Sequence, residues 1–243
     1  MTELLMAAEA GATIVTANRH AARSLRLAYD RRQAELGHEA WPSPDIIAWP
    51  GLMQRLWREA VIQGRAAGAI LSAIQERALW QDEIAAGGST NPAALAPGAV
   101  RAWRLLQEYA VPSLPPDGRS EPDYSVIAAE IQESAETAAF WGWCERIRQR
   151  LRDRGLISAS ALPALVARII LDSAASLPSE MIACGFDELT PQERAVISAL
   201  RARGVKWSEA PCAAPRGPVR ACRAADPLRE IEAAARWARA QLE

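Results

Sequence analysis

The sequence predicts an α/β fold in which a parallel β-sheet is interrupted by a large all-helical insertion. Two short apolar or β-branched runs, at residues 12–16 and 181–186, each precede a segment with apolar residues at helical spacing. Between them, residues 65–178 show helical spacing alone, broken by clusters of Gly, Pro and Ser. We therefore expect a helical subdomain placed inside an α/β domain.

The first part of the α/β domain is expected over residues 1–64. Its elements, in chain order, are a strand at 12–16, a helix at 18–36, a strand or extended segment at 45–49 and a helix near 51–63. Gly37 ends the first helix, because glycine favours the position after a helix C-terminus. The prolines of the WPSPDIIAWP segment forbid a helix there and leave only a short extended stretch.

The insertion at residues 65–178 is predicted to contain helices only, because no strand signal interrupts its pattern. The helices are expected near 70–86, 97–110, 125–155 and 160–176.

The second part of the α/β domain is expected over residues 179–210, where the apolar run MIACGF indicates a buried strand. Thr190, Pro191 and Glu193 form a capping-box pattern, which specifies the start of the next helix. Gly204 ends that helix, and residues 205–210 are a candidate strand.

The last part of the chain, residues 211–243, is predicted to hold a strand at 218–224 and a helix capped by Asp226 and Pro227. That helix pattern reaches Glu243 without a C-capping glycine, so we expect the natural polypeptide to continue.

Composition excludes several classes of protein. The chain carries 28 basic and 29 acidic side chains, so any contact with nucleic acid must come from local patches rather than from a global field. Its four cysteines and two histidines show no zinc-binding spacing and no disulfide framework. No apolar stretch of about 18 residues is present to span a membrane, and the first residues lack a basic region typical of a signal peptide. These features predict a cytoplasmic protein with reduced thiols and no membrane partner.

Three segments, in this order and spacing, resemble the motor core of superfamily 1 helicases. TIVTANRHAARSLR at 13–26 resembles motif Ia, DIIAWPGLMQRLW at 45–57 lies where the family has motif Ib, and IACGFDELTPQERAVISAL at 182–200 is similar to the Walker B strand and the helix behind it. Two further stretches, 140–162 and 226–242, resemble the helical inserted subdomain and the start of a second motor domain. The likeness is closest to the B-type (AddB/RexB-like) subunits of helicase-nucleases and to RecB-like repair proteins with a PD-(D/E)XK nuclease domain.

The resemblance implies a Rossmann-like sheet of the P-loop NTPase type, DNA as a single-stranded or duplex-end partner, and a helicase-nuclease partner subunit. It also implies that residues 211–243 begin a second, truncated motor-like domain.

The departures from that family argue against catalysis. The phosphate-binding pattern G-x-x-x-x-G-K-[ST] is absent, and Lys206, the only lysine, follows a valine instead of a glycine loop. Cys184 and Gly185 occupy the positions of the Mg-binding and water-orienting acids of the Walker B strand. Asp187 and Glu188 come two or three residues too late, so these four residues are interpreted as a vestigial Walker B element. We expect no catalytic residue, metal or cofactor in this chain.

The candidate DNA-binding residues lie on the first predicted helix and before the second. Arg19, Arg23 and Arg26 recur at i, i+4 and i+7 and so share one face of a helix. The resemblance to motif Ia implies that Thr16 and Asn18, with Arg19, contact a single-strand backbone. The alternative is a solvated arginine face without a ligand.

Trp49 is the tryptophan that we expect in a motif Ib-like loop beside Pro50 and Gly51, available for base stacking.

These observations predict a non-catalytic, helicase-like region that binds DNA or acts as a scaffold in a double-strand-break repair nuclease. Two alternatives remain open. One is a protein-interaction scaffold that does not bind nucleic acid, which the near-neutral charge of −1 allows. The other is an active ATP-dependent helicase subunit, against which the missing P-loop lysine argues.

Overall fold

The computed structural model describes residues 2–109, 135–172, 176–210 and 221–240. The chain divides into two compact units, Met1–Ala210 and Pro211–Glu243.

The first unit is built on a parallel sheet of four strands, which confirms the predicted α/β class with a parallel sheet. The strands are β1 (Thr13–Thr16), β2 (Ile46–Ala48), β5 (Glu180–Cys184) and β6 (Lys206–Glu209). Their order across the sheet is β2-β1-β5-β6, and every neighbouring pair is parallel. β5 therefore lies beside β1, so the chain returns to the same sheet after the helical insertion.

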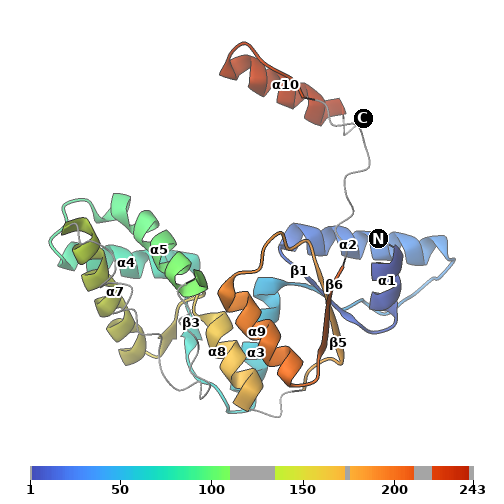
Figure 1. Cartoon of the computed structure of the whole chain (residues 1–243), viewed down its shortest axis with the longest axis horizontal. Coiled ribbons are helices and arrows are strands. Elements are labelled where there is room, and N and C mark those ends of the chain that lie inside the picture. The colour runs from blue at the N-terminus through green and yellow to red at the C-terminus, as the bar shows by residue number, and fades with distance from the viewer. Residues whose placement is uncertain (1, 110–134, 173–175, 211–220, 241–243) are drawn as a thin grey trace. The chain divides into compact units, whose positions relative to one another are not determined.

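Helices cover both faces of this sheet (Figure 1). On one face are α1 (Thr2–Glu9) and α2 (Arg19–Glu35), and on the other are α3 (Trp49–Ile62), α8 (Leu162–Asp172) and α9 (Pro191–Ala202). Neighbouring residues of β1 divide between the two cores, because successive side chains of a strand point to opposite faces. Ile14 packs with the α1 and α2 cluster, whereas Val15 packs with the α3, α8 and α9 cluster.

The ends of two helices follow the sequence rules closely. Asn18 is the N-cap of α2, and its side-chain oxygen accepts a hydrogen bond from the Ala21 amide at 2.9 Å. Thr190 and Glu193 form the predicted reciprocal capping box at the start of α9. The helix α1 was not predicted; it buries only Leu5 and Ala8 against the sheet.

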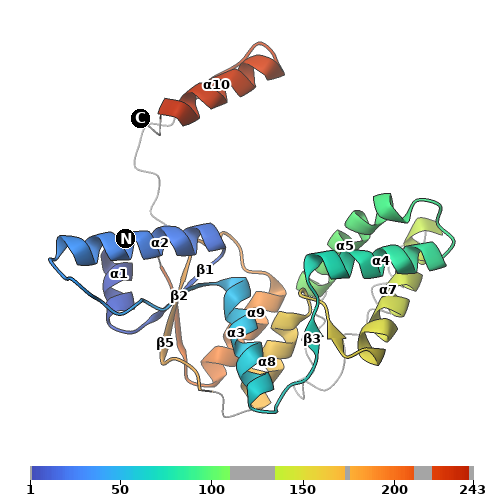
Figure 2. The ribbon, with the colours of Figure 1, turned by 180° about the vertical axis from the view of Figure 1, so that it is seen from behind.

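The insertion contains a second cluster of helices, seen from behind in Figure 2. It consists of α4 (Ala73–Ala86), α5 (Pro92–Tyr109) and α7 (Ala135–Asp153). Their shared core includes the fully buried Trp80, which stacks on Phe140 with a centroid distance of 6.1 Å, and Trp103. The helix α5 begins five residues earlier than the predicted 97 and continues through Pro97, while the first part of the helix predicted at 125–155 lies outside the described residues.

Two predictions about the insertion were wrong. It is not purely helical, because β3 (Ala69–Ile70) pairs in parallel with β4 (Leu156–Ile157) where the chain enters and leaves the helical cluster. In addition, α8 packs against α3 and α9 in the core of the α/β layer rather than with the other inserted helices. The apolar face of α8 is thus buried by the sheet domain, so the structural insertion ends before residue 162.

An ion cluster around one buried carboxylate joins two helices of the insertion. The Glu83 side chain on α4 is only 4% exposed, and its carboxylate pairs with Arg146 at 3.1 Å and with Arg150 at 2.8 Å, both from α7. Two guanidinium groups thereby neutralise a carboxylate that would otherwise be costly to bury. Some of the arginines along α7 therefore hold the helical cluster together.

The second unit contains α10 (Pro227–Ala240). Asp226 caps this helix as predicted, because its carboxylate accepts a hydrogen bond from the Arg229 amide at 2.9 Å. The strand predicted at 218–224 is wrong for residues 221–224, which form no strand, and residues 218–220 lie outside the described part. No residue of α10 is buried.

Candidate nucleic-acid interface at the carboxyl edge of the sheet

Two of the three segments that resemble helicase motifs, residues 13–26 and 182–200, meet at the carboxyl edge of the sheet. Thr16 at the end of β1 is in register with Cys184 at the end of β5, and the Ala17 amide donates to the Cys184 carbonyl at 3.3 Å. The helix after β1 lies on one face of the sheet and the helix after β5 on the other. In open parallel sheets this change of direction leaves a crevice where ligands bind. We therefore take the ends of β1 and β5 as the candidate site.

The residues that follow β1 are mostly used to build the turn into α2. Thr16 is fully buried, and its hydroxyl donates to the Asn18 carbonyl at 2.9 Å. The Asn18 side-chain oxygen caps the helix. The Thr16 side chain therefore offers no exposed polar group for the predicted backbone contact, because its hydroxyl is buried and already hydrogen-bonded. Asn18 itself is exposed at the edge of the sheet.

The predicted arginine row on α2 is divided by the structure. Arg19 and Arg23 are exposed, and in the described part of the chain neither forms an ion pair with an acid. Arg26 instead donates to the main-chain carbonyl of Ile46 on β2 and lies near Asp45. Its guanidinium therefore holds α2 to the edge strand. Two of the three arginines remain available for an external anion.

Asp45 lies just before β2, at the amino edge of the sheet and so at the end opposite the candidate site. Arg26 and Arg55 lie close to its carboxylate. It accepts hydrogen bonds from the Thr13 hydroxyl at 2.6 Å and from Arg55 at 2.7 Å. Partial burial raises the pKa of this carboxyl, but the hydrogen bonds from Arg55 and Thr13 and the charges of Arg55 and Arg26 outweigh burial, so its pKa lies below the ordinary value. Asp45 is thus paired with Arg55, Thr13 and Arg26 at the amino end of the sheet.

The segment after β5 turns sharply and presents two acids. Gly185 has a φ of 74°, a left-handed conformation that residues with a side chain rarely adopt, so the chain leaves the sheet directly after Cys184. Asp187 and Glu188 are exposed and precede the Thr190 cap of α9. Among the described residues no group of three or more His, Cys, Asp or Glu side chains is placed to hold a metal ion. Cys184 is half-buried in the layer under α2.

Trp49 differs from its expected place. It is the first residue of α3, not part of a loop, and it is 7% exposed. Its indole makes edge contacts with Phe186 at 6.0 Å and with Trp207 at 6.4 Å between ring centroids. Proline is well accommodated in the first turn of a helix, so Pro50 does not prevent the helix from starting here. The prediction of an exposed stacking platform was wrong, because the ring serves as packing beneath the β5 turn.

Lys206 lies at the opposite edge of the sheet from this site. It is the first residue of β6 and is paired with Glu180, the first residue of β5. Four residues of a strand span about 13 Å, so the Lys206 backbone lies about the length of the strand from the carboxyl edge. The sequence could indicate that the lysine lacks a glycine loop, but only the strand register shows at which end of the sheet it lies.

Comparisons with known proteins add no family to these observations. No family model matches this chain, and no curated protein sequence matches it. Within the described residues, no helix is both long enough and apolar enough to cross a membrane.

Proposed function

We propose that the first unit is a non-catalytic nucleic-acid-binding module that holds the backbone of single-stranded DNA at the carboxyl edge of its sheet. The observation that carries this proposal is the exposed pair Arg19 and Arg23, at the start of α2, with no acidic partner in the described part of the chain. Guanidinium groups are suited to phosphate, because they present several donors in a plane and keep their charge. They also lie on successive turns of one helix face.

The location of the pair supports the same conclusion. Arg19 is the first residue of α2, where the helix dipole favours an anion and the main-chain amides of the first turn are directed outward. The turn after β5 lies beside the end of β1, at the edge where open parallel sheets commonly bind ligands. A backbone contact of this kind would be independent of base sequence and sensitive to salt.

The resemblance of residues 13–26 and 182–200 to helicase motifs extends the proposal to a biological role. On that basis the chain belongs to a Rossmann-like, P-loop NTPase-type region of a double-strand-break repair nuclease, in which it steers DNA without hydrolysing ATP. Two features support the absence of turnover: the sequence has no phosphate-binding glycine loop, and its one lysine starts β6 at the amino edge.

The test is fluorescence anisotropy with labelled single-stranded DNA at low and moderate salt. We expect affinity to fall as salt rises, and Arg19→Ala with Arg23→Ala to weaken binding about tenfold or more, since each removes a phosphate contact. Arg31→Ala is the matched control, because Arg31 is also exposed on α2 but faces a different side of the helix. Equal loss in the control, or binding unaffected by the double substitution, would refute the assigned site.

A protein-interaction scaffold is the second candidate, and one observation favours it. The helix α10 exposes three large apolar side chains, Leu228, Ile231 and Trp237, each at least 65% exposed. Exposed apolar groups on one short helix are typical of a docking element. If single-stranded DNA does not bind at low salt, and replacement of these three residues abolishes association with a partner protein, the scaffold function is correct and the DNA-binding proposal is wrong.

A further inference from the structure

A surface pocket lies between α3 and α8, away from the carboxyl edge of the sheet. Its volume is about 460 Å³, which lies within the range of about 300–1,000 Å³ usual for ligand pockets. Its apolar floor is formed by Trp57, Ala66, Leu165 and Ile169. Trp57 comes two turns after the start of α3, so about 12 Å of helix separates it from the carboxyl end of β2. The pocket therefore needs a separate explanation.

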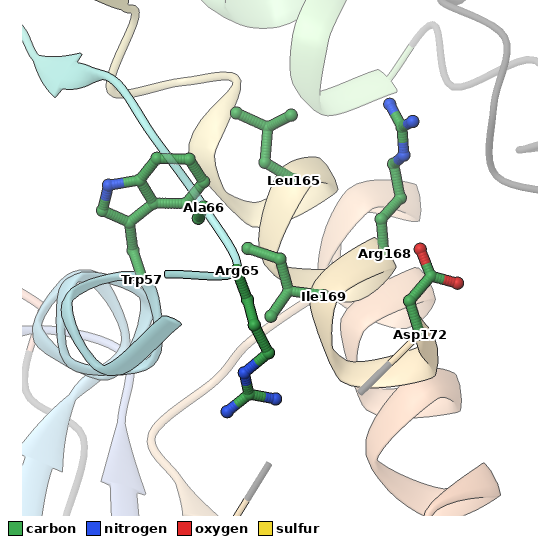
Figure 3. A pocket seen from close by; sticks show the side chains of 7 residues that line it. All are labelled: Trp57, Arg65, Ala66, Leu165, Arg168, Ile169 and Asp172. Carbon is green, nitrogen blue, oxygen red and sulfur yellow. The ribbon is translucent and has the colours of Figure 1, made fainter. Parts of the chain in front are cut away.

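Two arginines stand on opposite sides of this apolar floor (Figure 3). Arg65 follows α3 and extends away on one side, and Arg168 extends from α8 on the other. Among the described residues neither guanidinium forms an ion pair with a carboxylate, Asp172 on the rim included. The pocket thus combines an apolar centre with a positive charge at each side, and one acid next to the Arg168 side.

We infer that this pocket binds an acidic peptide segment in which a large apolar side chain is flanked by carboxylates. The apolar side chain would bury surface against Trp57, Leu165 and Ile169, which is favourable because it removes apolar area from water. Acidic residues before and after it would pair with Arg65 and Arg168, because guanidinium and carboxylate match in geometry.

A nucleic-acid strand fits this pocket less well than such a peptide. Its phosphates repeat along the whole backbone, whereas an apolar floor separates the two guanidiniums. The charge of Asp172 predicts the direction of one mutational effect on peptide binding. A carboxylate bound at Arg168 would be repelled by Asp172, so removal of that acid should strengthen binding of an acidic peptide.

The experiment uses the full chain and three fluorescein-labelled ten-residue peptides. The first carries Leu-Phe between two pairs of acidic residues, the second replaces those acids by their amides, and the third replaces Leu-Phe by two serines. We expect only the first to bind, as read by anisotropy at low salt. Failure of the first peptide to bind below about 1 mM, or equal binding of the amide peptide, would overturn the inference.

Variants locate the site. Arg65→Gln and Arg168→Gln should each weaken binding about five- to tenfold, and Asp172→Asn should tighten it about two- to threefold. Arg101→Gln is the matched control, because Arg101 is exposed on α5 and does not line the pocket. Weaker or unchanged binding in Asp172→Asn, or displacement of the peptide by single-stranded DNA in a manner that depends on Arg168, would contradict an acidic-peptide site. Since Arg19 and Arg23 take no part, this result is independent of the DNA-binding proposal.

Discussion

Arg26 on α2 donates a hydrogen bond to the main-chain carbonyl of Ile46, and through it the first long helix is attached to the edge strand of the sheet. The same guanidinium lowers the pKa of the neighbouring Asp45. A residue that belongs by spacing to an arginine row with Arg19 and Arg23 thus has a structural role that the other two lack.

This difference predicts that replacement of Arg26 lowers the stability of the fold, whereas replacement of Arg23 hardly changes it. Arg26→Met should lower the free energy of unfolding by about 1–3 kcal/mol, because it removes a charged donor from a carbonyl and from the vicinity of Asp45. Arg23→Met should change it by no more than about 0.5 kcal/mol, since Arg23 is exposed. Urea unfolding followed by circular dichroism measures both. Equal stability of the two variants would show that Arg26 does not hold α2 to β2.

The burial of Trp49 leads to a second prediction. Trp49→Ala should destabilise the first unit by about 3–5 kcal/mol, because it empties a site packed against Phe186 and Trp207. Trp237→Ala on α10 is the control, and it should leave the first unit unaffected, since Trp237 is 67% exposed and belongs to the second unit. Thermal unfolding distinguishes the two. Wild-type stability in Trp49→Ala would contradict the packing role that we assign to this indole.

Glu76 on α4 gives the stability a pH dependence. Burial raises the pKa of this carboxyl, and the hydrogen bond from the Ser158 hydroxyl opposes the shift only in part. A raised pKa in the folded state means that its contribution is fully present below the unfolded value of about 4.3 and is lost as pH rises through the folded value.

Glu76→Gln should therefore raise the free energy of unfolding near pH 7 and have little effect near pH 4, because the amide cannot ionise and can still accept from Ser158. Denaturant unfolding at the two pH values tests this. The exposed Glu188 offers a control as Glu188→Gln, which should change neither value by more than about 0.5 kcal/mol. A loss of stability at pH 7 in Glu76→Gln would contradict the assigned direction.

The cysteines should react with alkylating reagents at very different rates. Burial raises the pKa of Cys144 to about 12, so its thiol is neutral and covered under ordinary conditions. Cys222 is exposed. Mass spectrometry after brief treatment with iodoacetamide at pH 8 should find Cys222 modified and Cys144 unmodified, and both modified after unfolding in urea. Rapid modification of native Cys144 would mean that the helical cluster opens readily.

Much of the fold follows from local pattern. The strand at 12–16 and the capping box at Thr190 were predicted, because both depend on neighbouring residues. The Asn18 cap of α2 is equally local, but Asn18 was predicted only as a DNA contact. The helix α1 was missed because it buries only two side chains. The paired strands β3 and β4 were missed because each has two residues, too few to show a period, and their partners are far apart in sequence.

The candidate site was predictable only in part. Sequence spacing placed Arg19 and Arg23 on one helix face, and the structure leaves both exposed. Sequence spacing could not reveal that Thr16 faces inward or that Trp49 packs under the β5 turn. Nor could it reveal that Arg65 and Arg168 flank one pocket. Each of these facts depends on contacts between elements that are distant along the chain.

By itself the sequence determined the α/β class and the absence of a phosphate-binding glycine loop, because hydrophobic period, helix caps and motif residues are local properties of the chain. Only the tertiary structure decided that β5 returns beside β1, that the lone lysine lies at the amino edge, and which arginines are left without an acidic partner among the described residues. The physical reason is that burial and charge pairing are set by the packing of distant segments, which no local pattern records.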